Sequence, residues 1–371
     1  MRIAIVGGGP AGAYLGYCLA AKGIEATLFD DSHPREKPCG GGLSTFALRK
    51  FPILHELPSG KVEGNKIFLI SPSGREAMIE GREKGWNVSR AKLDGFLLER
   101  ATDEGTKLIK ERVAAVKKGG GWEIKTNKHL YHADILVGAD GVNSIVRKTL
   151  VGPIRKEDLG FCYGCFTSVS REMEDMEGIM QFLKGMMGYA WLFPRETDCS
   201  IGIGTDIEHV KRAKKELDIF VKKYAKNAKI ISKWGALIPS ARTPAFFRQP
   251  AAGNDWLLIG DAAGHVNPVT GEGIVYALWS ASLASKALEE GDMALFDALW
   301  RKEYGFNMEA GVKARYAFYN PLVINSSVWL AQRSGGLSEF LYASINNEIP
   351  YNGFTKNLAK AMVRGFIEGV L

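Results

Sequence analysis

Residues 3–31 read IAIVGGGPAGAYLGYCLAAKGIEATLFDD, and this stretch decides the fold. The short apolar run Ile3–Val6 is typical of a buried parallel strand. A glycine-rich turn follows, and then a helix of small residues that runs to about Lys22 and ends at Gly23. A second strand, Ala26–Phe29, leads directly into an acidic pair. This order of strand, glycine turn, helix, strand and acid predicts a βαβ unit that binds a dinucleotide.

Each residue of the glycine turn has a physical role. Gly7 permits the tight turn, Gly9 lets the backbone approach a pyrophosphate, and Gly12 lets helix and strand pack closely. The helix start at Pro10 and Ala11 adds free backbone amides and the positive end of the helix dipole, which favour a phosphate. These five residues are our candidates for holding the diphosphate.

Acids at the end of the second strand complete the unit. A carboxylate at this place accepts hydrogen bonds from ribose hydroxyls, so we assign Asp30 to the ribose, with Asp31 as the alternate. A βαβ unit that holds no nucleotide is the competing interpretation. No second glycine fingerprint is evident in the sequence, so NAD(P)H, if used, binds without a domain of its own.

The size, charge and cysteine content of the chain limit its domain number, its partners and its cellular setting. The 371 residues suffice for a cofactor domain and a second domain. The net charge of +7 favours an anionic surface or substrate. No basic run is interleaved with aromatic residues, so we expect no nucleic-acid partner. The five cysteines, an odd number, indicate a reducing, cytoplasmic setting.

Three later segments indicate which dinucleotide is bound. Residues 135–141 (ILVGADG) and 256–263 (WLLIGDAA) read as buried strands ending in an aspartate, and residues 88–94 (VSRAKLD) open a helix. In order and separation they resemble the signature segments of the p-hydroxybenzoate-hydroxylase-like FAD superfamily. The resemblance implies one non-covalent FAD, with Arg90 at its diphosphate or ribose. The segments also supply the cofactor-site candidates Asp140, Gly260 and Asp261.

The segment that ends in Gly260-Asp261, together with the residues that follow it, suggests contacts with the flavin half of FAD. Asp261, at a strand end, can hydrogen-bond the ribityl hydroxyls of FAD. Residues 268–273 (PVTGEG) then lead into a helix expected over 274–289. Amides at a helix start at Ile274 favour the anionic N1/O2 edge of reduced flavin. Gly271 and Gly273 let the main chain lie against the ring; an ordinary glycine-rich turn is the alternative.

Two more segments narrow the family. Residues 38–44 read PCGGGLS and residues 188–194 read GYAWLFP. With the FAD segments they resemble the geranylgeranyl reductase family over about residues 1–300. The resemblance implies that reduced FAD saturates isolated C=C bonds of prenyl chains, with a prenyl lipid as substrate. It also implies an external electron donor, which is ferredoxin, NAD(P)H or another reductant.

The two family segments carry the candidate catalytic residues. Strand period two puts Tyr189, Trp191 and Phe193 on one face, where an aromatic wall suits a prenyl chain and excludes water. Plain core residues are the alternative. Cys39 lies in a loop whose neighbours Gly40 and Gly41 let the backbone approach the flavin. It is a candidate proton donor or substrate-positioning group; a small buried residue is the alternative.

Two other features invite a functional interpretation that we do not favour. Cys162-x-x-Cys165 has no second pair for a metal site, and on a strand the two thiols face opposite ways, so we predict no metal. His265 is read as a polar loop residue rather than a catalytic base.

The fold class expected is α/β: a Rossmann-type FAD-binding domain, an inserted antiparallel-sheet substrate domain and a helical C-terminal region. Strands are expected at 66–70, 76–79, 161–170, 178–183, 189–193 and 199–205, and a helix over 208–226. The FAD domain takes residues 1–60, 86–155 and 245–300, the substrate domain 61–85 and 156–244, and the helical region 301–371.

Rival functions share parts of this pattern. A flavin monooxygenase shares every FAD segment. A flavin-dependent halogenase carries a Trp-x-Trp-x-Ile-Pro segment, from which Tyr189 and Phe193 depart. A non-catalytic prenyl-binding or electron-transfer flavoprotein is the third rival. For the reductase, a bilayer-resident substrate and a basic chain without an apolar run of membrane-spanning length predict a cytoplasmic protein that associates peripherally with membranes.

Overall fold

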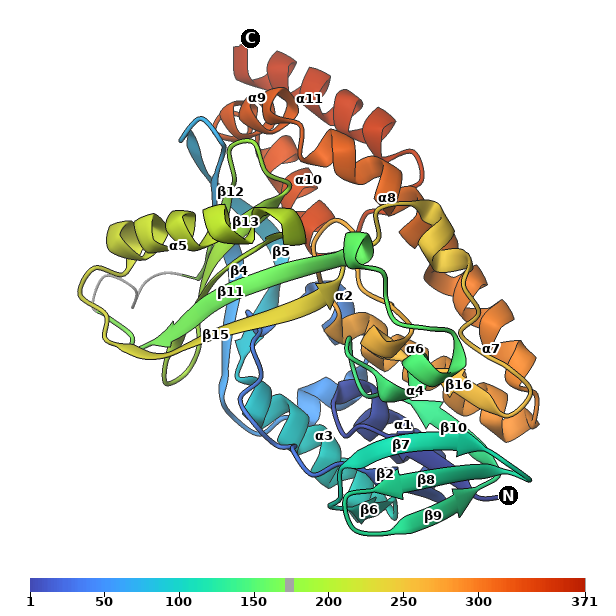
Figure 1. The fold of residues 1–371 in the computed structure, drawn as a ribbon. Coiled ribbons are helices and arrows are strands. Elements are labelled where there is room, and N and C mark those ends of the chain that lie inside the picture. Colours follow the sequence, from blue (N-terminus) through green and yellow to red (C-terminus); the bar gives the residue numbers. More distant parts are fainter. Residues whose placement is uncertain (171–176, 371) are drawn as a thin grey trace.

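The computed structural model describes residues 1–170 and 177–370 of the chain (Figure 1). The first of its two large sheets has five parallel strands in the order β16-β10-β1-β2-β6. The strands are β1 (Ile3–Val6), β2 (Ala26–Phe29), β6 (Lys107–Ile109), β10 (Ile135–Gly138) and β16 (Trp256–Leu258). Both β1 and β10 are buried along their whole length, which explains their continuous apolar sequence.

Helices pack together beside this sheet. They are α1 (Pro10–Ala20), α3 (Arg90–Glu104) and α6 (Ile274–Glu290), and α1 contacts both of the others. The short helices α2 (Thr45–Lys50) and α4 (Ile145–Leu150) lie in the connections. A three-stranded antiparallel sheet that the sequence analysis did not anticipate, β7 (Val113–Lys118), β8 (Trp122–Thr126) and β9 (Leu130–Ala133), lies next to the parallel sheet (Figure 1).

The second large sheet has eight strands in the order β15-β11-β14-β13-β12-β4-β5-β3. They are β3 (Gly42–Leu43), β4 (Lys61–Ile70), β5 (Glu76–Val88), β11 (Leu159–Thr167), β12 (Ile179–Phe182), β13 (Gly188–Pro194), β14 (Cys199–Asp206) and β15 (Ile230–Pro239). Helix α5 (Val210–Tyr224) buries its apolar side against this sheet.

This sheet is mixed rather than wholly antiparallel as expected, because β12 pairs with β4 in parallel. A tight hairpin would have forced the two strands to run in opposite directions. They are instead separated by a long excursion of the chain through the first sheet, so the direction of β12 is free to match that of β4.

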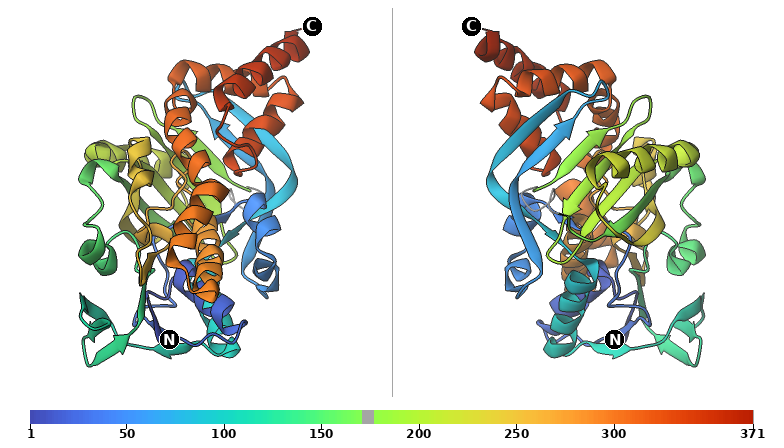
Figure 2. Two further views of the ribbon diagram at one scale, coloured as in Figure 1. Left: turned by 90° about the vertical axis from the view of Figure 1, so that its right-hand side faces the viewer. Right: turned by 90° about the vertical axis from the view of Figure 1, so that its left-hand side faces the viewer.

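The C-terminal region is helical, as expected. It contains α7 (Met293–Trp300), α8 (Phe306–Phe318), α9 (Pro321–Ala331), α10 (Gly335–Ile345) and α11 (Phe354–Val370). Residues of α8 to α11 share a hydrophobic core with β4, β5 and β12. The far end of α11 projects away from the rest of the molecule (Figure 2). Across the described ranges, no helix combines the length and apolarity needed to cross a bilayer.

The predicted fold class is confirmed. The domain boundaries stay a prediction, and the second sheet crosses them: β3 lies within residues 1–60, and its partners on β5, Trp86 and Asn87, lie within residues 86–155. The loop that carries Cys39 therefore leads from the parallel sheet directly to the edge of the other sheet.

Candidate cofactor and substrate site

The glycine turn after β1 is packed too closely for side chains. A Cβ built on Gly7, whose φ is +105°, would lie 2.5 Å from the carbonyl oxygen of Ala139, and one built on Gly12 would lie 1.9 Å from that of Gly7. Helix α1 begins at Pro10, and its N-cap residue, Gly9, has no side chain that could accept a hydrogen bond from the first amides of the helix. The first amides of α1 are thus free for an anion, and the turn fits a diphosphate.

Asp30 lies against this turn. Its carboxylate accepts hydrogen bonds from the backbone N–H of Gly8 at 2.7 Å and from the backbone N–H of His33 at 2.7 Å, and it lies 2.9 Å from His33 Nδ1. Burial alone would raise the pKa of Asp30, but hydrogen bonds from His33 and its charge outweigh burial and hold that pKa below its usual range. Asp31 instead faces Arg112 at 3.2 Å near the surface. Of the two acids, Asp30 is the one that contacts the glycine turn.

Arg90 is buried and ion-paired. Its Nε and Nη2 each lie 2.8 Å from a carboxylate oxygen of Asp94, and that carboxylate lies 3.6 Å from His33 Nε2. Burial would lower the pKa of Arg90, but Asp94 and the nearby thiol of Cys39 raise it. A buried chain of charged groups therefore runs from Asp30 to the Cys39 loop. The expected contact of Arg90 with a diphosphate stays a prediction.

Asp140 follows β10 and holds the start of α4. Its carboxylate accepts hydrogen bonds from the backbone N–H of Ile145 at 2.6 Å and from the hydroxyl of Ser144. Burial raises the pKa of Asp140 in spite of these bonds. Its backbone neighbour Ala139 contacts Gly7, so the segment supports the glycine turn.

A second free helix start lies at α6. Asp261 Oδ1 is 3.2 Å from the Cβ position of Gly273, which places this carboxylate beside the beginning of the helix. Gly271 has φ +74°, a left-handed conformation that favours glycine. The N-cap residue of α6, Gly273, has no side chain that could accept a hydrogen bond from the first amides of the helix. The first amides of α6, from Ile274 onward, are thus available to an electron-rich group.

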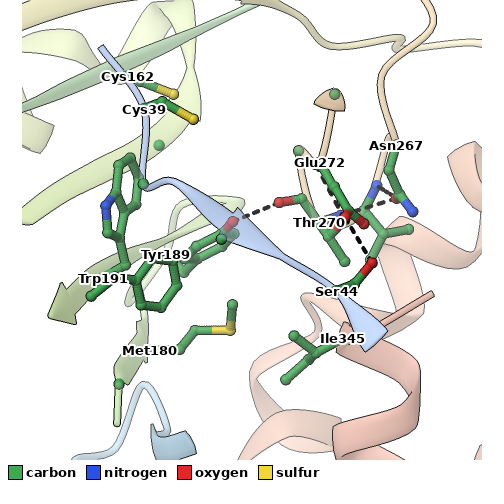
Figure 3. A pocket seen from close by; sticks show the side chains of 18 of the residues that line it. Cys39, Ser44, Cys162, Met180, Tyr189, Trp191, Asn267, Thr270, Glu272 and Ile345 are labelled. Carbon is green, nitrogen blue, oxygen red and sulfur yellow. Dashed lines mark hydrogen bonds between the residues drawn. The ribbon is translucent and has the colours of Figure 1, made fainter. Parts of the chain in front are cut away.

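A cavity of about 270 Å³ lies between the second sheet, the α6 loop and the C-terminal helices. Figure 3 shows side chains from these elements converging on it. The predicted site residues that line it are Cys39, Gly40, Gly41, Tyr189, Trp191, Phe193, Gly271, Gly273 and Ile274. The other candidates lie along the parallel sheet. The structure therefore separates the candidate residues into one group along the parallel sheet and a second group at the cavity.

The aromatic residues of β13 form one side of the cavity. The Trp191 ring centroid lies 5.9 Å from that of Tyr189 and 6.4 Å from that of Phe193. The Tyr189 hydroxyl donates a hydrogen bond to the carbonyl oxygen of Thr270 at 2.6 Å. The wall is thereby tied to the loop before α6.

The cysteine loop is fixed to the same wall. Ser200 Oγ donates to the carbonyl oxygen of Cys39 at 2.9 Å, and Trp191 Nε1 donates to Ser200 Oγ at 3.3 Å. A Cβ on Gly40 would lie 2.9 Å from Cδ2 of Phe193. The two segments that indicated the family are thus one packed unit. Cys162 lies beside Cys39 in Figure 3.

Sequence reasoning missed Glu272. Its side chain lines the cavity and accepts a hydrogen bond from Ser44 Oγ at 2.8 Å and another from Asn347 Nδ2. Burial raises the pKa of this carboxyl to about 7, against the lowering effect of both hydrogen bonds. The sequence signal that could have identified Glu272 is its position between two glycines, Gly271 and Gly273, directly before the start of a helix.

Further cavity residues also escaped the sequence analysis, because they come from strand neighbours and C-terminal helices that only the fold brings near. They include Met180, Arg315, Tyr319, Tyr342, Ile345 and Asn346.

The structure shows where the Cys162-x-x-Cys165 pair and His265 lie. Cys162 lines the cavity, whereas Cys165 belongs to the core beneath α5, so the two thiols do face opposite ways. His265 is buried with its ring centroid 4.5 Å from that of Trp300 and its Nδ1 2.9 Å from the hydroxyl of Tyr304. Burial, with Arg301 nearby, lowers the pKa of His265 to about 3, so this imidazole is a neutral core group.

Comparison with known proteins gives sequence relatives and structural neighbours, although no protein-family model matches the chain. The geranylgeranyl diphosphate reductase of Rhodobacter capsulatus is 31% identical over 324 residues, which cover 81% of this chain and 80% of that protein. A geranylgeranyl bacteriochlorophyll reductase-like protein of Thermoplasma acidophilum superposes with a TM-score of 0.77 at 19% identity, over 97% of this chain and 98% of that one. A flavin-dependent brominase superposes with a TM-score of 0.66 at 20% identity, over 98% and 93%. Both structures have the same fold as this chain.

Proposed function

Because the chain belongs to the geranylgeranyl reductase family, an FAD-dependent family of oxidoreductases, we propose that it saturates isolated C=C bonds of prenyl chains carried by isoprenoid lipids. The observation that carries this proposal is the cavity with an aromatic wall on one side and the free start of α6 on the other. Its lining suits an apolar chain, and the helix start suits an electron-rich ring edge.

FAD fits the residues present. The diphosphate would be held by Gly9 and the first amides of α1, the ribose by Asp30, the ribityl chain by Asp261, and the ring edge by the amides that begin at Ile274. Bound and reduced, this cofactor supplies the hydride for the reaction.

The chain's own residues position the substrate and exclude water. An isolated alkene carries no carbonyl that an acid or metal could polarise, so positioning must supply much of the rate, with proximity worth up to about 7–11 kcal/mol in favourable cases. Tyr189, Trp191 and Phe193 would align the chain and keep the cavity dry. Cys39, fixed to this wall through Ser200, would set which double bond reaches the reacting position.

The proposed partners follow from this chemistry. The substrate is a prenyl lipid, and ferredoxin, NAD(P)H or another reductant supplies the electrons from outside the fold.

The projecting end of α11 offers a membrane contact. It exposes Val363, Phe366 and Ile367 by 62%, 52% and 52%, beside the cationic residues Lys360 and Arg364. Exposed apolar residues next to cations suit an anionic bilayer surface, which is where the proposed substrate resides.

Rival functions are disfavoured by particular residues. The brominase-like fold is shared, but Tyr189 and Phe193 stand where the halogenase segment has Trp and Ile. A monooxygenase would act on an aromatic ring with O₂, whereas the apolar side chains that line the cavity, among them Met180, Trp191 and Ile345, suit a prenyl chain. A non-catalytic prenyl carrier would bind the lipid and leave its double bonds unchanged.

One experiment tests the proposal. Dithionite-reduced holoenzyme is incubated anaerobically with prenyl lipids, and mass spectrometry counts the hydrogens added. We expect gains of two hydrogens per double bond, together with FAD, not FMN, released by denaturation. Tight lipid binding with no gain in mass would favour a carrier. In a parallel incubation with O₂ and halide, an oxygenated or halogenated product would favour a monooxygenase or a halogenase.

A further inference from the structure

We propose that Glu272 is the acid that delivers the proton when a prenyl double bond is saturated. This inference rests on the proposed reductase function and adds to it a source for the second hydrogen. The carboxyl lies between Gly271 and Gly273, at the free start of α6, and its side chain lines the substrate cavity (Figure 3).

The position of Glu272 is fixed from two sides of the cavity. Ser44, at the end of the cysteine loop, donates to Oε1 at 2.8 Å, and Asn347, after α10, donates to Oε2. Asn347 is itself held by Asn267. Among the residues the structure describes, Asn347 alone has a positive φ without being glycine, at 59°. Helices commonly end with a residue in this left-handed conformation, which Asn readily adopts, so the end of α10 sets where the Asn347 side chain lies.

The surroundings of this carboxyl favour its neutral form. The side chain is half-buried, and its exposure is to the cavity rather than to open solvent. No salt bridge to Glu272 is found in the described ranges. The other groups around it are the hydroxyl of Ser44, the amide of Asn347 and the buried phenols Tyr189, Tyr276 and Tyr351. None of these is a cation that would stabilise a carboxylate, and burial raises the carboxyl pKa to about 7.

The reaction balances with this assignment. Saturation of one C=C bond adds a hydride, which reduced FAD supplies to one carbon, and a proton, which the Glu272 O–H supplies to the other. The π bond of the alkene, the O–H bond of Glu272 and the N–H bond of reduced FAD that supplies the hydride break; two C–H bonds form, and oxidised FAD regains a double bond. The alkene is reduced and the flavin oxidised. Glu272 is left as a carboxylate, which regains its proton from water.

Two other donors that line the cavity, Cys162 and Tyr189, are weaker acids than Glu272. Burial raises the pKa of the Cys162 thiol to about 12. Burial also raises the pKa of Tyr189 well above its ordinary value, and its proton is engaged with Thr270. A carboxyl with a pKa near neutral pH is the best matched acid for catalysis at that pH.

The test compares Glu272→Gln with Glu272→Asp in the FAD-loaded protein. Gln keeps the shape but has no transferable proton. Because general acid catalysis is typically worth about 10²–10⁴-fold, Gln should slow the alkene-dependent oxidation of reduced flavin at least about a hundredfold. Asp should recover part of this rate. The matched control is Glu348→Gln, a nearby acid bonded to Thr45 and paired with Arg49 at 3.3 Å, which should keep the wild-type rate.

A second measurement needs no turnover. Infrared spectra of the wild-type holoprotein should contain a protonated-carboxyl band that disappears as pH rises through about 7 and that Glu272→Gln lacks. A wild-type oxidation rate in Glu272→Gln, or the same infrared titration in that variant, would overturn the assignment. A wild-type enzyme that reduces no prenyl lipid, yet retains the Glu272 band, would instead overturn the proposed function.

Discussion

Gly40 lies directly against the ring of Phe193, where a Cβ on the glycine would come within 2.9 Å of Cδ2. The contact joins the cysteine loop to the aromatic strand, two segments far apart in the sequence. Neither segment can change its course without moving the other. The shape of the cavity near Cys39 therefore depends on the absence of one methyl group.

This contact predicts the effect of two single substitutions. Gly40→Ala should destabilise the protein by about 1–3 kcal/mol, as overpacking of a well-filled site does. Gly42→Ala in the same loop is the control, because its Cβ would find its nearest atoms at 3.8 Å, an ordinary contact. Chemical denaturation of both variants measures the difference, and equal stability of the two would contradict the packing argument.

Removing the Asp261 carboxylate should weaken FAD binding. Asp261→Asn loses a charge-assisted hydrogen bond, worth about 1.5–3 kcal/mol, and so tenfold or more in the dissociation constant. Flavin fluorescence during titration of the apoprotein measures this constant. Asp218→Asn on the exposed side of α5 is the control and should bind FAD as the wild type does. Equal affinity in both variants would mean that Asp261 does not hold the cofactor.

Substitution of Cys39 should separate positioning from acid catalysis. If Glu272 supplies the proton, Cys39→Ala should retain FAD and change the alkene-dependent rate only modestly. The main changes should be in lipid affinity and in which double bonds are reduced, measured by mass spectrometry of the products. A loss of at least about a hundredfold in both Cys39→Ala and Cys39→Ser would instead assign the proton to the thiol.

The raised pKa of Glu272 predicts a dependence of stability on pH. The folded-state pKa of about 7 lies above the ordinary carboxyl value of 4.5, so the folded protein holds the proton more tightly. Protonated Glu272 therefore stabilises the folded protein, and this contribution is present in full at pH values below about 4.5. It is lost as the pH rises through about 7, which lowers the free energy of unfolding by up to about 3 kcal/mol. Denaturation of wild type and Glu272→Gln across this range should give a difference that falls with pH; a constant difference would argue against a shifted pKa.

The exposed residues of α11 predict where a membrane is contacted. Replacing Val363, Phe366 and Ile367 by Ser should weaken binding to anionic vesicles at low salt, because each apolar side chain then loses its place in the lipid interface. Ile219→Ser, an equally exposed apolar residue on the basic helix α5, is the control. Flotation assays compare the two proteins. Equal flotation would place the membrane contact elsewhere or remove it.

Local sequence patterns predicted β1, β2, β10 and β16 of the first sheet, but not its edge strand β6. The segments around Gly7 and Ile274 follow rules that act over a few residues, and α6 begins at the expected residue. The parallel pairing of β12 with β4 was not predictable, because it depends on the path of the chain between them. Glu272 was overlooked for a related reason: its importance comes from Ser44 and Asn347, which only the folded chain brings to it.

The order in which the strands are made has its own consequence. β10 receives its outer neighbour β16 only after the strands of the second sheet from β11 to β15 have been synthesised. Until then a growing chain on the ribosome carries an unpaired apolar edge, which is prone to aggregate. The two free helix starts that would hold FAD lie on either side of this interval, at Pro10 before β10 and at Ile274 after β16. Capture of the cofactor by both helix starts therefore waits until the chain beyond Ile274 has been synthesised, and the cellular yield should depend on how the nascent edge is shielded from other chains.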